Sequence, residues 1–402
     1  MPAAPPDRPL DGVSVVEFTT YVAAPSCCGV LSDWGADVVR VEPPGGDILR
    51  RIMQVTTGRD VPHPPFVGDN RGKKSVALDL KTDAGMAAMG MLVSAADVFV
   101  TNFRVPALQR LGLDPDALHA RHPALVVAIL TAYGRAGPDR DRPGYDIAAF
   151  WARSGLAMNP VPAGEAPRVP SHGVGDRVTG MNLAGGICAA LFRRSRTGSG
   201  CVVETSLLHT GAVANGGLLS LALASGGGPG GAPPYPHPLS PGANPLCQTY
   251  RTADGEYLEL LGMESQRHLA SISGGLALPE LLSDGRFRSA SSRSENRGAL
   301  HELIQDVMQR RTLQEWLPRL DAHGVWFAAH QRVGQLAQDP QAIAAGLLAR
   351  LPDGTRTYGS SMLFSDAARG GRLPTAPRAG APGAGEHTGE VLRRVGAPGP
   401  LL

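Results

Sequence analysis

Residues 13–42, VSVVEFTTYVAAPSCCGVLSDWGADVVRVE, contain a complete strand-helix-strand pattern. VSVVEF (13–18) is a short run rich in β-branched residues, which predicts a buried strand. VAAPSCCGVLSDW (22–34) follows with small residues and predicts a helix that begins near Pro25. ADVVRVE (36–42) predicts a second strand. This order indicates two parallel strands joined by a crossover helix.

The same alternation continues along the chain. AGMAAMGMLVSAA (84–96) predicts a further helix, and three more segments predict strands: KSVALDL (74–80), DVFVTNF (97–103) and ALVVAIL (124–130). We therefore expect an α/β protein with an open, Rossmann-like, mostly parallel sheet. Ligands bind beyond the carboxyl ends of such strands, which directs attention to the loops 19–25, 43–51, 102–110 and 131–145.

The chain is too long for a single core. It has 402 residues, of which 43% are hydrophobic and 18% charged, so two globular lobes are expected. A stretch rich in Gly, Pro, Ala and Ser that contains GGGPGG (226–231) reads as a linker. The expected organisation is a large domain over 1–215, a linker over 216–245, a small α+β domain over 246–325 and a return segment over 326–402 that completes the large domain.

The small domain carries its own local signals. QTYRTADGEYLELLGM (248–263) predicts a hairpin with its turn at Asp254 and Gly255. Thr312 and Glu315 form a capping-box pattern ahead of a helix. The preceding helix has apolar residues at helical spacing, namely Leu300, Leu303, Ile304, Val307 and Met308. These are core and cap positions and indicate no binding site.

Charge and cysteine content exclude several classes of protein. The formal net charge is only +2, from 38 basic and 36 acidic residues, which argues against a nucleic-acid or anionic-membrane surface. Five cysteines without a CxxC pair indicate neither a zinc site nor a disulfide framework. The N-terminal residues show no apolar signal core, and no apolar run is long enough for a membrane span. A cytoplasmic protein is expected.

Several common active-site motifs are absent. TTYVAAP follows the first strand where a dinucleotide-binding protein has GxGxxG, and the chain has no P-loop and no GxSxG elbow. His119 and His122 lack a third ligand, so no metal site is expected. Cys27 and Cys28 are interpreted as packing residues. Asn102, Phe103, Arg104 and Tyr133 follow strands and fit a loop-closing or a ligand-contacting role equally well.

Asp176 lies in VPSHGVGDRVTGMNLAGG (169–186), where an irregular stretch passes into a helix. An aspartate ahead of a helix is commonly an N-cap, because its side chain accepts hydrogen bonds from unpaired backbone N–H groups. The same position suits a nucleophile, because the helix N-terminus favours the ionised carboxylate. Residue chemistry alone leaves both interpretations open.

The ordered motifs of the chain resemble the family III coenzyme A transferases, which include formyl-CoA transferase. The similarity runs along nearly the whole chain, through LDGVSVVEFT, LSDWGADVVRVEPPGGDILR, NRGKKSVALDLKTDAG, DVFVTNFR, LQRLGLD, TAYGRAGPDRDRPGYD, GDRVTGMNLAGGICAALFRRSRTGSG, NPLCQTYRTADGEYLEL and GEHTGEVLRRVG. In that family the aspartate of the GD motif is catalytic. The resemblance therefore implies that Asp176, ionised at neutral pH, attacks an acyl-CoA thioester and carries CoA as an aspartyl thioester.

The resemblance also implies a coenzyme A site and no metal. It places Tyr21, Ala23, Leu78, Lys81, Asn102, Phe103, Arg104, Arg110 and Tyr133 along the cofactor. Cationic side chains suit the phosphates of this anionic group. Three departures from formyl-CoA transferase make oxalate and formate poor substrates: Val22 replaces a glutamine, Pro43 replaces an arginine, and YPHPLSPGANPL (235–246) lacks a tetraglycine loop.

Short segments, among them PGYDIAAFWARSG, are most similar to the 2-hydroxyacid branch of the family, which acts on phenyllactate and 2-hydroxyisocaproate. The α-methylacyl-CoA racemases are an alternative, but they carry a catalytic histidine where this chain has Tyr145, and a phenol is a poor base at neutral pH. A CoA-binding relative without catalysis is a second alternative, which the retained Asp176 disfavours.

The expected partners are an acyl-CoA donor, a small carboxylic acid acceptor and a second copy of the chain. The resemblance implies an interlinked homodimer, in which two chains thread through one another. Composition and periodicity could not have predicted this arrangement, because linked topologies are rare.

Overall fold

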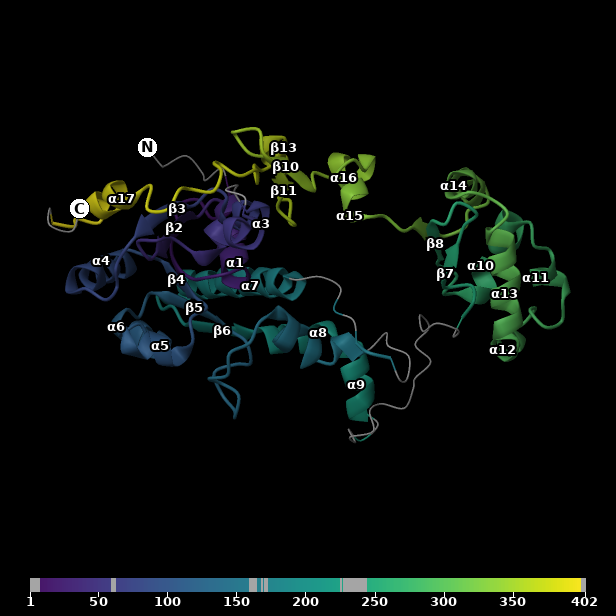
Figure 1. Cartoon of the computed structure of the whole chain (residues 1–402), viewed down its shortest axis with the longest axis horizontal. Coiled ribbons are helices and arrows are strands. Elements are labelled where there is room, and N and C mark those ends of the chain that lie inside the picture. The colour runs from purple at the N-terminus through teal and green to yellow at the C-terminus, as the bar shows by residue number, and fades with distance from the viewer. Residues whose placement is uncertain are drawn as a thin grey trace. The chain divides into compact units, whose positions relative to one another are not determined.

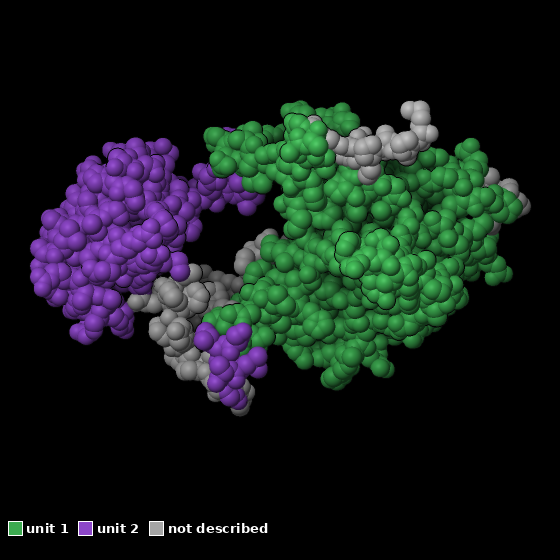
Figure 2. Space-filling model, turned by 180° about the vertical axis from the view of Figure 1, so that it is seen from behind, with its two compact units in different colours: residues 1–219, 340–402 green, residues 220–339 purple. Residues whose placement is uncertain are grey.

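A computed structural model describes residues 8–58, 63–158, 165–167, 169, 173–224, 226 and 244–398. The chain forms two compact units (Figures 1 and 2). Unit 1 comprises residues 1–219 together with 340–402, and unit 2 comprises residues 220–339. The predicted linker over 216–245 falls largely on residues outside this description, as does the YPHPLSPGANPL segment. The first residues of the predicted linker belong to helix α9 (Gly216–Ala224).

Unit 1 is built on a six-stranded parallel sheet in the order β3-β2-β1-β4-β5-β6. The strands are β1 (Ser14–Phe18), β2 (Asp37–Glu42), β3 (Lys74–Ala77), β4 (Val98–Thr101), β5 (Val126–Thr131) and β6 (Val202–Ser206). The prediction of a mostly parallel α/β sheet is confirmed. The sequence analysis missed β6, whose VVETS sequence is partly polar because this edge strand is only half-buried over most of its length.

Alternate residues of each strand face opposite layers of helices. Val15 of β1 belongs to a core with α1 (Ala23–Asp33) and α7 (Val174–Thr197), whereas Val16 belongs to a core with α4 (Asp83–Ser94) and α17 (Thr388–Arg394). Gly180 lets α7 approach α1 closely, because a Cβ there would collide with the carbonyl of Ala23 and the hydroxyl of Ser26. Helix α1 begins two residues before Pro25, which lies in its first turn.

Shorter elements complete unit 1. They are η1 (Ile48–Arg51), α2 (Ile52–Thr57), α3 (Pro64–Asn70), α5 (Val105–Arg110), α6 (Pro115–Arg121), the π-helical turn η2 (Ile147–Ala152), η3 (Leu156–Met158), α8 (Leu207–Ala214), α16 (Pro340–Ala344), η4 (Ala367–Arg369) and two small hairpins, β10 (Leu348–Arg350) with β11 (Arg356–Tyr358) and β12 (Ser365–Asp366) with β13 (Gly371–Arg372).

Residues near the C-terminus cover the outer edge of β3. The backbone N–H of His387 donates to the carbonyl of Ser75 (2.9 Å), and the N–H of Ala77 donates to the hydroxyl of Thr388 (3.0 Å). The N–H of Gly385 donates to the Ser75 hydroxyl (2.8 Å). A sheet edge exposes unpaired backbone groups, and here a segment more than 300 residues away in sequence pairs with them.

A buried ionic network joins β1, β2 and η1. Arg40 is fully buried and donates to Glu17 (2.5 Å) and to Asp47 (2.6 Å). Lys73 pairs with the second oxygen of Glu17 (2.7 Å). Burial alone would raise the pKa of Glu42, but hydrogen bonds from Arg50 and the charge of Arg40 lower it to about 2. The network fixes the loop that leaves β2 at the carboxyl edge of the sheet.

Unit 2 has a three-stranded antiparallel sheet formed by β7 (Thr249–Arg251), β8 (Tyr257–Leu260) and β9 (Phe327–Ala329). The predicted hairpin at Asp254 and Gly255 is confirmed, as is the Thr312–Glu315 capping box. The helices are α10 (Ser265–Leu276), α11 (Glu280–Ser283), α12 (Ala290–Glu295), α13 (Arg297–Met308), α14 (Leu313–Ala322) and α15 (Val333–Leu336). Residues of α10, α11, α13 and α14 form one core with Trp316, which is 1% exposed.

Within the described ranges no single helix combines the length and the apolar character that a membrane span requires. Helices α8 and α9 are long and apolar enough only when they are taken together, and the chain bends by 76° between them.

Candidate active site

The site lies at the carboxyl edge of the parallel sheet, where β1 and β4 are neighbours. The strand order reverses at this point, which is where open α/β sheets place their ligands. The loops after the two strands are tied together by Asn102. Its side-chain oxygen accepts from the N–H of Thr20 (2.9 Å), and its amide donates to the carbonyl of Thr20 (2.8 Å). Asn102 therefore acts as a loop-closing residue in this structure.

Helix α7 brings Asp176 to this edge. The N-cap is Gly173, whose φ of 77° is in the left-handed region, so Asp176 lies in the first turn of the helix. Of the two interpretations left open for Asp176, the N-cap does not hold, because the helix begins at Val174. The N–H of Gly173 donates to the carboxylate of Asp146 (2.6 Å), and this bond anchors the helix start. Gly175 has no space for a side chain, because a Cβ would collide with the Phe150 ring and with Asp146.

Asp176 is half-buried, and its side chain makes no hydrogen bond to any described residue. Burial and the negative charge of Asp146 raise its pKa to about 7, while the adjacent Arg177 acts in the opposite direction. With a pKa of about 7 the carboxyl group is only partly ionised at neutral pH, whereas the sequence-based expectation is an ionised carboxylate. A carboxyl group that titrates near neutrality at a ligand-binding edge is typical of a functional site.

Arg177 connects this turn to α3. Its guanidinium donates to both oxygens of the buried Asp69, at 3.2 and 2.9 Å, and to the carbonyl of Gly173 (3.2 Å). The hydroxyl of Tyr358, from β11, donates to the same carboxylate of Asp69. Four residues around this turn could not be predicted from the sequence, because their proximity arises only from the tertiary fold: Asp69, Asp146, Arg177 and Tyr358.

Two phenol groups come from residues next to those that contact Gly173: Tyr21 precedes Val22, and Tyr145 precedes Asp146. The hydroxyl of Tyr145 donates to that of Tyr21 (3.3 Å), and their rings meet edge to face with centroids 5.3 Å apart. Tyr21 has a φ of 60°, an unusual value for a residue other than glycine, and strained backbone of this kind gathers at functional sites. A Cβ on Gly173 would lie 3.7 Å from Cγ1 of Val22 and 3.9 Å from Oδ2 of Asp176, so the Tyr21 loop and the carboxylate flank the same glycine.

The remaining residues proposed for coenzyme A all follow β1, β3, β4 or β5. Ala23 and Leu78 are buried, and Phe103 stacks on Phe18 with a centroid distance of 4.3 Å. Tyr133 is half-buried, with the guanidinium of Arg153 6.0 Å from its ring centroid. The exposed cations of the set are Lys81, Arg104 and Arg110. No geometry in the structure joins all of these residues into one pocket, and their contacts with coenzyme A stay predictions.

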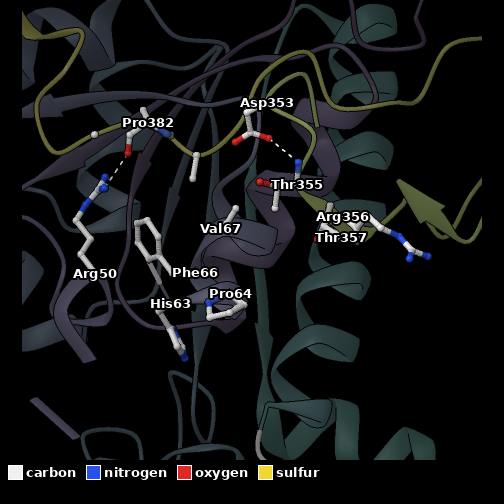
Figure 3. Close-up of a pocket in the computed structure, with 12 residues that line it drawn as sticks. Arg50, His63, Pro64, Phe66, Val67, Asp353, Thr355, Arg356, Thr357 and Pro382 are labelled. Atoms are coloured by element: carbon white, nitrogen blue, oxygen red, sulfur yellow. Dashed lines mark hydrogen bonds between the residues drawn. The ribbon is translucent and has the colours of Figure 1, made fainter. Parts of the chain in front are cut away.

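A separate cavity of about 590 Å³ lies between α3 and the C-terminal segment (Figure 3). It is lined by Arg50, His63, Phe66, Thr355, Thr357 and Pro382, among others. Arg50 donates to the carbonyl of Pro382 (2.7 Å) and stacks on Phe66. None of the predicted site residues lines this cavity.

In the described part of the chain, no group of three or more His, Cys, Asp or Glu side chains is arranged to hold a metal ion.

The family model described as CoA-transferase family III matches residues 10–388. The chain is 32% identical over 399 residues to (R)-2-hydroxy-4-methylpentanoate CoA-transferase of Clostridioides difficile, covering 96% of this chain and 95% of the relative. It is 29% identical to cinnamoyl-CoA:phenyllactate CoA-transferase of Clostridium sporogenes, covering 96% and 93%.

A solved structure is similar over nearly its full length. It is that of Rv3272 from Mycobacterium tuberculosis, with a TM-score of 0.82, 30% sequence identity, and coverage of 96% of this chain and 99% of that one.

Proposed function

The chain belongs to CoA-transferase family III, and from this membership we propose that it transfers CoA through a covalent thioester on Asp176. One observation carries this proposal: Asp176 lies half-buried, without a hydrogen-bond partner among the described residues, in the first turn of α7 at the ligand-binding edge of the sheet. Its carboxylate is thus available for attack. Only the ionised carboxylate of Asp176 can attack a bound thioester. Because the pKa of Asp176 is raised, its ionised carboxylate is more basic, and therefore more nucleophilic, than that of an ordinary aspartate.

The proposed reaction exchanges one thioester for another. A carboxylate oxygen of Asp176 attacks the carbonyl carbon of the donor acyl-CoA, the C–S bond breaks, and the products are a CoA thiolate and a mixed anhydride between Asp176 and the donor acid. The thiolate then attacks the side-chain carbonyl of Asp176, which releases the donor acid and leaves an aspartyl-CoA thioester. The acceptor carboxylate repeats both steps in reverse, so the reaction needs no ATP.

The proposed acceptor is a 2-hydroxy acid. The names of two similar proteins refer to acids of this class. The hydroxyls of Tyr21 and Tyr145 support it, because a phenol can both donate and accept a hydrogen bond. Each tyrosine directly precedes a residue that contacts Gly173, the N-cap of the helix that carries Asp176. For coenzyme A, the exposed Lys81, Arg104 and Arg110 suit the phosphates. The reaction as proposed involves no metal.

A donor and acceptor panel tests this proposal. The enzyme is incubated with one acyl-CoA and a mixture of free acids, and new CoA esters are identified by mass spectrometry. We expect CoA esters of branched and aromatic 2-hydroxy acids to form faster than those of the matched acids without the hydroxyl. Equal rates for the two sets would contradict the 2-hydroxy acid assignment while leaving CoA transfer itself intact.

We also propose that the enzyme is a homodimer of interlinked chains, as the resemblance to the family implies. The chain has a mass of 41.9 kDa, so sedimentation at nanomolar concentration should give a species of twice that mass. Interlinked chains cannot separate without unfolding, so dilution should not release monomers. A monomer at any concentration that preserves the fold would refute this arrangement.

A further inference from the structure

Three side chains from distant parts of unit 1 meet behind the first turn of α7. Asp69 is 1% exposed and lies at the end of α3. It accepts two hydrogen bonds from Arg177 and one from the hydroxyl of Tyr358, which follows it by 289 residues in sequence. Arg177 also donates to the carbonyl of the helix N-cap, Gly173. The guanidinium therefore ties the turn that carries Asp176 to α3.

The place occupied by Tyr358 is closely fitted. A Cβ on Gly68 would lie 2.8 Å from the Tyr358 ring, so only glycine allows the ring to pack on α3. The guanidinium of Arg71 lies 4.8 Å from the centroid of the Tyr358 ring. Arg71 donates a hydrogen bond to the carboxylate of Asp33, which holds the guanidinium in place. Burial raises the pKa of Tyr358 to about 12, so its hydroxyl remains protonated and donates to Asp69. The hairpin of β10 and β11 thereby contributes to the surroundings of Asp176.

The charged groups that act on Asp176 come from three elements. Arg177 is on α7, Asp69 is on α3, and Asp146 directly precedes η2. Among them Arg177 alone is cationic and favours the ionised carboxylate, and both aspartates oppose it. His63, ahead of α3, faces the Asp69–Arg177 pair, and burial lowers its pKa, which favours the neutral ring.

We propose that Arg177, Asp69 and Tyr358 form a positioning unit that fixes the first turn of α7 and sets how readily Asp176 ionises, with Arg177 favouring the ionised carboxylate and Asp69 opposing it. This inference rests on the proposed role of Asp176 as the nucleophile. The three residues do not react themselves. Asp69 and Tyr358 hold the guanidinium, and the guanidinium offsets the negative charge that surrounds Asp176.

Two substitutions should act in opposite directions. Arg177→Gln removes the cation, so the pKa of Asp176 and the acidic limb of the pH–rate profile should move upward by about 1 unit. Asp69→Asn removes an anion and frees Arg177 to approach Asp176, so both should move downward by a similar amount. Arg177→Lys retains the charge and should restore most of the wild-type profile. Tyr358→Phe leaves the full charge on Asp69 and should give a smaller upward shift.

The measurement has two readouts. The pH–rate profile of CoA transfer gives the acidic limb, and the carboxyl 13C resonance of Asp176, assigned by its loss in Asp176→Asn, gives the pKa without any substrate. Arg194→Gln is the matched control, because Arg194 is on the same helix and pairs with Asp97 (2.9 Å) near the other end. It should move neither readout.

The outcomes separate this inference from the proposed function. Shifts of the 13C titration in opposite directions for Arg177→Gln and Asp69→Asn support the positioning unit. Unchanged titrations, or shifts in the same direction, overturn it even if Asp176 forms the covalent adduct. If the titrations shift as expected but no adduct forms on Asp176, the assignment of the nucleophile fails while the electrostatic role of Arg177 stands.

Discussion

Replacing Asp176 with asparagine is expected to reduce CoA transfer by about 10⁴-fold or more, because an amide cannot form the anhydride and the thioester. The fold should survive. Burial raises the pKa of Asp176 to about 7, so the folded state holds a proton that the unfolded state releases near pH 4. Stability therefore falls as the pH rises from about 4 to about 7, and the full cost is present at pH 8. Asparagine removes that cost, so this inactive variant should melt at an equal or higher temperature at pH 8.

Chemical trapping provides the positive evidence for the same prediction. Hydroxylamine added during turnover should modify Asp176, because an aspartyl thioester or anhydride is electrophilic, and peptide mass spectrometry locates the adduct. Asp83→Asn is the matched control, since Asp83 is an exposed aspartate in the first turn of another helix, α4. It should retain wild-type turnover. Appreciable transfer by Asp176→Asn, or an adduct on a different residue, would exclude Asp176 as the nucleophile.

Replacing Arg40 with methionine should lower the free energy of unfolding of unit 1 by about 3 to 5 kcal/mol, because it leaves buried carboxylates without their cation. Asp47 loses its partner at 2.6 Å, while Glu17 retains Lys73 and Glu42 retains Arg50. Hydrogen exchange of the β1 and β2 amides measures this loss in unit 1 by itself, whereas a global melt would combine two units.

Arg394→Met is the control for the buried network. Arg394 pairs with Asp37 at 2.5 Å, but its side chain is 47% exposed, and exposed ion pairs contribute only about 0 to 1 kcal/mol. Acid titration adds a second check. The pKa of Glu42 is lowered from 4.5 to about 2, so its ionised carboxylate stabilises the folded state at pH values above about 4.5. This contribution is lost as the pH falls toward 2. Equal effects of the Arg40 and Arg394 variants would show that the network contributes nothing beyond an ordinary surface pair.

Local signals explain why much of the fold could be predicted. The apolar strands and the intervening helices are continuous in sequence, so VSVVEF and ADVVRVE identify β1 and β2 without knowledge of their partners. The capping box of α14 spans only four residues and was equally visible. The start of α7 was misplaced because Gly173 adopts a left-handed conformation and is anchored by Asp146, 27 residues earlier.

The site could be predicted only where resemblance supplied it. Asp176 was found through a family motif, whereas Asp69 and Tyr358 are separated by 289 residues and meet only in the folded chain. The partial protonation of Asp176 could not be predicted from the sequence for the same reason. Burial and the charge of Asp146 depend on tertiary packing, which a single sequence does not encode in any local pattern.

The pairing of residues 385–388 with the outer edge of β3 has a consequence for synthesis of the chain. Translation at 5 to 20 residues per second leaves this edge without its cover for roughly 15 to 60 s after β3 has emerged from the ribosome. Throughout that interval a nascent chain carries exposed backbone groups that can pair with a neighbouring nascent chain. Yield of active enzyme in the cell should therefore depend on chaperones that bind ribosome-attached chains, and slowing translation should increase aggregation.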